Sequence, residues 1–135
     1  MGLDNGIEVK RTPYTNALPE LQCFNGPWDD EHKYNFEVAY WRKCYNVRSM
    51  IMNTVQSVRN NGTSDPLTTE NIDAIINGLQ SFNSDNWQDN GGSIWDWDDK
   101  EYPYSEHIKH DIENLKTLRK LMNKYDLEVY FYDSY

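Results

Sequence analysis

The residues best suited to chemistry are three cations and two aromatic rings within eight positions of one another. They are Trp41, Arg42, Lys43, Tyr45 and Arg48. Arginine can hold a phosphate through two hydrogen bonds, and an aromatic ring can stack on a nucleobase. We therefore predict a stripe that binds a small, anionic, nucleotide-like ligand. The sequence leaves an alternative open, in which the rings pack at the edge of the core and the cations pair with surface acids.

A second unusual segment, residues 84–103, interleaves tryptophan with aspartate around an Asn-Gly-Gly turn. Aromatic anchors rimmed by charge are typical of binding hot spots. The segment thus predicts a surface for a basic protein, with carboxylates in place of the phosphates of a nucleic acid. The alternative is a hairpin with its tryptophans inward and its aspartates in water. The residues of this predicted surface are Trp87, Trp95, Asp96, Trp97, Asp98 and Asp99.

Patterns that indicate catalysis or metal binding are weak. The chain has no GxSxG elbow, no P-loop and no GxGxxG fingerprint. His107, His110 and Asp111 fall within one helical turn, but a zinc site needs three or four ligands with supporting partners. The aspartate run lacks the glycine-anchored loop of a calcium hand. We expect no metal, no cofactor and no catalysis, and keep a small enzyme without a recognised motif as a further alternative.

Length and charge narrow the class of protein. The 135 residues fit a single domain, residues 1–135, and aromatic residues compensate for an apolar share of only 38%. The net charge of −9 lies entirely after residue 59, where fifteen acids face six bases. Direct binding of duplex nucleic acid needs a basic face, so it is not expected. No apolar run is long enough for a membrane helix and no signal segment opens the chain, so we expect a cytosolic protein.

The hydrophobic periodicity predicts an α+β fold. Alternating residues predict strands within 1–11, 94–98 and 127–132, while a proline-rich loop is expected over 12–35. Steps of three and four predict helices over 36–59, 68–82 and 105–124. This order favours about three helices packed on one face of a small, mostly antiparallel sheet. The inward stripe of the first helix is predicted to hold Tyr40, Cys44, Val47, Ile51, Val55 and Val58.

Three segments, MGLDNGI, FEVAYWRKCYN and LEVYFYDSY, resemble a family of small, uncharacterised phage and prophage proteins. The tight matches are Met1–Asp4 and Ala39–Lys43, whereas Asn5-Gly6 stands where the family usually has Met-Tyr. The resemblance implies a phage origin and a place in the host cytosol, without a particular activity. It adds Asp4 to the predicted ligand-binding residues, beside the stripe that begins at Trp41.

Together these observations predict a non-catalytic phage accessory protein, acting in counter-defence by sequestering an anionic small ligand. The alternative is an acidic inhibitor of a host nucleic-acid-binding protein, acting through the segment rich in tryptophan and aspartate. A homo-oligomer is compatible with either function.

Overall fold

The computed structural model describes residues 4–24, 35–42, 45–55, 64–81 and 104–134, with side chains except at 4, 42–46, 104–108 and 134. One or two helical elements separate each described strand from the next. In order they are β1 (Asp4–Val9), α1 (Pro13–Asn16), the 3-10 helix η1 (Pro19–Phe24), β2 (Phe36–Arg42), α2 (Tyr45–Val55), β3 (Ser64–Pro66), α3 (Thr69–Gln80), α4 (Tyr104–Lys124) and β4 (Val129–Ser134).

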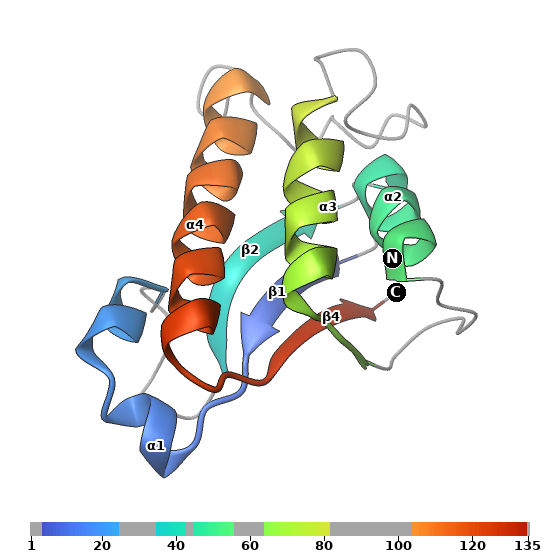
Figure 1. Ribbon diagram of the computed structural model, residues 1–135. Helices are drawn as coiled ribbons and strands as arrows, with labels where there is room; N and C mark the ends of the chain where they lie inside the picture. The colour runs from blue at the N-terminus through green and yellow to red at the C-terminus, as the bar shows by residue number, and fades with distance from the viewer. Residues whose placement is uncertain (1–3, 25–34, 43–44, 56–63, 82–103, 135) are drawn as a thin grey trace.

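The strands form one antiparallel four-stranded sheet in the order β2-β1-β4-β3. β1 lies at its centre and pairs with β2 on one side and β4 on the other. Figure 1 shows α4, α3 and α2 side by side on one face of this sheet. The predicted α+β class, with helices packed on one face of a small antiparallel sheet, is therefore confirmed.

The helix predicted over 36–59 is wrong in its first third. Phe36–Arg42 forms the strand β2, and the helix begins only at Tyr45. Aromatic and β-branched residues favour strands, and the pairing of this segment with β1 overrides the helical spacing. Tyr40, predicted to face inward, is 37% exposed, whereas Val47 and Ile51 are fully buried as expected. Cys44 and Val58 lie outside the described side chains.

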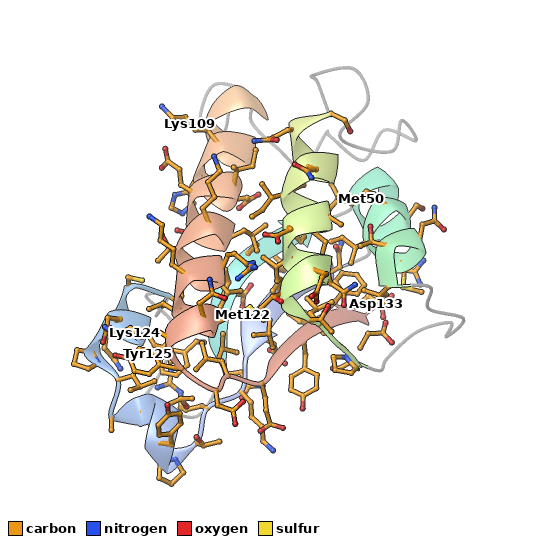
Figure 2. The ribbon with its side chains drawn as sticks, viewed as in Figure 1. Met50, Lys109, Met122, Lys124, Tyr125 and Asp133 are labelled. Atoms are coloured by element: carbon orange, nitrogen blue, oxygen red, sulfur yellow. The ribbon has the colours of Figure 1, made fainter. Side chains whose placement is uncertain are left out.

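The other predicted helices are confirmed, and their apolar faces form the core against the sheet. Thr68 caps α3, since its hydroxyl accepts a hydrogen bond from the backbone N–H of Asn71 at 3.1 Å. Gly78 lets α3 approach α2, because a Cβ there would come within 2.5 Å of Met50 Sδ. Figure 2 shows Met50 between these two helices. The fully buried residues of α3, α4 and the inner strands are Ile7, Val9, Ile72, Ile75, Leu79, Leu115, Leu118 and Phe131.

The segment predicted as a loop, residues 12–35, contains two short helical turns in its described part. Thr12 caps α1 in a reciprocal capping box with Thr15. The turn η1 is joined to the end of α4, where Lys124 Nζ and the Tyr125 hydroxyl both donate to Glu20 Oε2, at 2.7 and 2.8 Å. Lys124 and Tyr125 are labelled beside this segment in Figure 2. The strand predicted over 94–98 lies outside the described residues, and β3 was not predicted.

Gly6 meets a close approach of backbone at the centre of the sheet. The register between β1 and β2 shifts between Ile7 and Glu8, which marks a β-bulge. A Cβ at Gly6 would lie 2.5 Å from the Ala39 carbonyl oxygen and 2.8 Å from the Tyr132 hydroxyl. Tyr132 donates to Glu37 Oε1 at 3.2 Å, so its side chain reaches from β4 across β1 to β2. Only glycine leaves room for both neighbours.

We predict that Gly6→Ala lowers the free energy of unfolding by about 1–3 kcal/mol, the usual cost of overpacking. The added methyl group meets backbone that is fixed by pairing on both sides of β1. Urea denaturation monitored by tryptophan fluorescence measures the change. Gly78→Ala is the matched control, because its methyl group meets the flexible end of Met50 and gains about 1 kcal/mol of helix propensity. Equal losses at both positions would contradict the special role of Gly6.

Candidate functional site

Polar residues cross the sheet in one row on the face that the helices cover. In the registered pairing, Asn5 of β1 stands between Trp41 of β2 and Asp133 of β4. All three are almost completely buried. Directly paired residues have Cβ atoms about 4.5–5.5 Å apart, so the three side chains are close neighbours. We call this set, with Asp111 and Arg48 that contact its two ends, the polar row.

Asp111 closes the polar row on the side of α4. Trp41 Nε1 donates to Asp111 Oδ2 at 2.7 Å, and both residues are buried. Burial raises the pKa of the Asp111 carboxyl to about 8, although the hydrogen bond from Trp41 acts in the opposite direction. Near neutral pH the carboxyl is therefore mostly protonated. It can accept from the indole without the cost of an unpaired buried charge.

Arg48 closes the polar row on the side of α2. Its Nε donates to Asp133 Oδ2 at 2.6 Å, with side chains that are 16% and 0% exposed. Figure 2 labels Asp133 on β4, the strand that carries this end of the row. A buried carboxylate needs such a partner, because an unpaired charge in the interior is expensive. The two ends of the row are thus held by different means, a protonated acid and an ion pair.

Asn5 lies in the middle of the polar row and is incompletely satisfied. Its Nδ2 donates to the Trp41 carbonyl oxygen at 3.4 Å, a long hydrogen bond. Its Oδ1 is a buried polar atom with no hydrogen-bond partner among the described residues. Most buried polar groups have a hydrogen-bond partner, so Asn5 Oδ1 is the atom at which hydrogen bonding within the polar row is least complete.

The polar row contains the elements of acid and base chemistry, namely one protonated and one ion-paired carboxyl. Enzymes use such pairs when the environment separates the roles of two acids. Here each carboxyl is bound to a side chain of the fold, Asp111 to Trp41 and Asp133 to Arg48. The described geometry therefore fits a structural network that fixes α2 and α4 on the sheet.

The predicted ligand-binding stripe does not lie along one helix. Trp41 and Arg42 belong to β2, whereas Tyr45 and Arg48 belong to α2. The structure does bring Asp4 and Arg42 together, as directly paired positions of β1 and β2. Trp41 points to the opposite face of the sheet from Arg42, since neighbouring strand residues alternate. Lys43 lies outside the described residues. For Asp4, Arg42 and Tyr45 the structure describes the backbone and not the side chain.

The outcome differs among the other residues that the sequence proposed for a site. The predicted partner surface, residues 87–99, lies outside the described residues. His110 is exposed and contacts Asn114 on its own helix at 3.3 Å, while Asp111 turns inward to Trp41. Over the described residues, no three potential ligands gather into a group that could hold a metal ion. In the same part of the chain, no helix is both long and apolar enough to span a bilayer.

Sequence reasoning missed most of the polar row. Asp133 and Asn5 were not singled out, because a polar residue in a terminal strand normally faces water. The signal for Asp133 was its place two positions after Phe131, on the inward face of the predicted strand. Asp111 was considered only with the histidines, although it precedes Leu115 and Leu118 at inward helical spacing.

Comparisons of the chain with protein-family models, with curated proteins and with solved structures found no significant match.

We predict that Arg48→Ala lowers the free energy of unfolding by about 3 kcal/mol, because it takes the guanidinium away from a buried carboxylate. Chemical denaturation at neutral pH measures the loss. The matched control is Arg119→Ala, which breaks the surface pair with Asp73, a side chain that is 53% exposed. Exposed pairs contribute less than about 1 kcal/mol, so the control should change little. Similar effects of the two substitutions would contradict the structural role of the Arg48–Asp133 pair.

We predict that Asp111→Asn stabilises the protein increasingly as pH rises from about 4 to about 8. In the folded wild-type protein the pKa of the Asp111 carboxyl is raised above its value in the unfolded chain. The neutral carboxyl therefore contributes fully to the free energy of unfolding below the pKa of the unfolded chain. This contribution is lost as pH rises toward the pKa of the folded protein. The slope for one group is at most about 1.4 kcal/mol per pH unit. Asparagine still accepts from Trp41 but does not ionise, so this slope disappears.

Urea denaturation of both proteins at several pH values tests this expectation. Glu113→Gln, an exposed substitution on the same helix, is the control and should follow the wild-type profile. A constant difference between wild type and Asp111→Asn across the pH range would show that the carboxyl is not buried in its neutral form.

Proposed function

We propose that this protein is a non-catalytic binding protein that acts by occupying a basic surface of another protein. The observation that carries the proposal is the commitment of Trp41 and Arg48 to the fold. The indole is buried against Asp111, and the guanidinium bonds the buried Asp133. The two residues best suited to stack a base and bind a phosphate are therefore engaged elsewhere, which weakens sequestration of an anionic ligand.

The charge of the chain supports a basic partner. Acids outnumber bases by 22 to 13, and the sequence isoelectric point is about 4.7. Such an excess repels nucleic acids and anionic ligands and attracts positively charged surfaces, which accelerates association. Proteins that bind nucleic acids carry the complementary charge. The phage origin predicted from the sequence favours a host protein as the target, with inhibition by occupancy as the proposed effect.

The proposal predicts that the purified protein binds an arginine-rich peptide and not a glutamate-rich peptide of equal length. Fluorescence anisotropy with labelled peptides measures both affinities. The affinity should fall as salt rises through about 150 mM, where the Debye length is about 8 Å. Absence of binding to the arginine peptide at low salt would overturn the proposal.

A thermal-shift screen with nucleotides, cyclic nucleotides and ADP-ribose derivatives tests the competing function. A ligand at about 100 times its dissociation constant adds ~2.7 kcal/mol to the stability of the folded state. Such a shift, lost on replacement of Arg42 or Lys43 by alanine, would favour sequestration of an anionic ligand. We expect no shift.

A further inference from the structure

The sheet has a second face, which α2, α3 and α4 do not cover (Figure 1). Residues of β1 alternate between the two faces, so Gly6 and Glu8 stand opposite to the inward Asn5, Ile7 and Val9. Across the sheet, Gly6 is paired with Tyr40 and Tyr132, and Glu8 with Glu37 and Tyr130. We call the six residues Tyr40, Gly6, Tyr132, Glu37, Glu8 and Tyr130 the tyrosine-glutamate face.

Side-chain contacts hold this face in a defined arrangement. The Tyr132 hydroxyl donates to Glu37 Oε1 at 3.2 Å, and Asn35 Nδ2 donates to Glu8 Oε1 at 2.9 Å. Burial and the nearby Glu37 raise the pKa of the Tyr132 phenol far above its usual range, so it remains neutral and a donor. Because Gly6 has no side chain, the tyrosine passes over β1. The two carboxylates are thereby fixed before any partner arrives.

The side chains of the tyrosine-glutamate face are exposed or partly exposed. Tyr40 on the edge strand β2 is 37% exposed, and Glu8, Glu37, Tyr130 and Tyr132 are partly exposed. The two glutamates and the three rings of the face are therefore at least partly accessible to solvent. Rings next to carboxylates suit a cation in two ways, because the ring face attracts it and the carboxylate forms a charge-assisted hydrogen bond.

We propose that the tyrosine-glutamate face is the docking surface for an arginine- and lysine-rich segment of the partner protein. This inference rests on the proposed function and deepens it by naming the surface. Charge complementarity selects the occupant. Lys10 and Arg42 also lie on this side of the sheet, but each has an acid as its neighbour, Glu128 in a salt bridge and Asp4 in the strand pairing. Glu8 and Glu37 therefore leave the face with excess negative charge. Guanidinium groups of the segment contact Glu8 and Glu37, and their planes lie against Tyr40. The fixed carboxylates reduce the ordering cost that flexible surface acids would impose.

The decisive variant is the double substitution Glu8→Gln and Glu37→Gln. Glutamine keeps the Oε1 acceptors for Asn35 and Tyr132 and removes only the charges. We expect the arginine-rich peptide to bind about tenfold more weakly, which corresponds to about 1.4 kcal/mol. The matched control is Glu70→Gln with Glu113→Gln, two exposed acids on α3 and α4 that leave the face intact. This control should bind within about twofold of wild type, as expected for charges outside the contact.

A second variant, Tyr40→Ala, tests the aromatic contribution without changing charge. It replaces an exposed side chain, and we expect severalfold weaker binding with a melting temperature close to that of wild type. Melting curves of every variant establish that the fold is retained. Wild-type affinity of both the double glutamine variant and Tyr40→Ala would overturn the docking surface.

The triple substitution Asp96→Asn, Asp98→Asn and Asp99→Asn separates this inference from the proposed function. Loss of binding in this triple variant, with unchanged binding in the double glutamine variant, would overturn the docking surface and leave the proposed function standing. Failure of the wild-type protein to bind the arginine-rich peptide would overturn both. Loss of binding in the double glutamine variant alone would support both.

Discussion

The hydrogen bond from Trp41 Nε1 to Asp111 Oδ2 fixes the position of the longest helix on the sheet. It joins the edge strand β2 to α4 inside the core, where the carboxyl has little access to water. One helical turn further along, Asn114 Nδ2 donates to the Val38 carbonyl oxygen at 3.1 Å, beside the bulge of β2. Since residues three apart share a face of a helix, the two contacts fix both the rotation and the position of α4. The salt bridge between Arg119 and Asp73 then links α3 to α4.

The polar row runs across the sheet from β2 to β4, where the pair of Asp133 with Arg48 fixes α2 in the same way. An apolar row would stabilise the core at least as well, because burying polar groups is costly unless they are paired. Directional bonds accept fewer alternative packings than apolar contacts do. The pairing of Arg48 with Asp133 therefore defines one register for β4 and one place for α2. The bond of Trp41 to Asp111 and that of Arg48 to Asp133 commit both side chains to the fold.

The fold class followed from residue spacing, and so did the later helices. Ile72, Ile75 and Leu79 on α3, and Leu115 and Leu118 on α4, repeat at helical intervals, and Thr68 provides a cap that local sequence reveals. The start of α2 could not be predicted, because Phe36–Arg42 satisfies both helical and strand spacing and only pairing with β1 decides between them. The site was predicted less well. Its polar row joins residues from both ends of the chain, and no local pattern shows that Asn5 will face Asp133.

The central strand has a consequence for how the chain is made. Asp4 of β1 is paired with Ser134 of β4, so the first and last described strands are neighbours, as Figure 1 shows for β1 and β4. On a ribosome adding roughly 5–20 residues per second, β1 waits on the order of ten seconds for this partner. During that interval β1 can pair only with β2, and its other edge is open to association with any exposed strand. Contacts so distant in sequence are closed late and slowly. That edge of β1 is therefore open until β4 has been synthesised, whereas in the finished sheet β4 covers it.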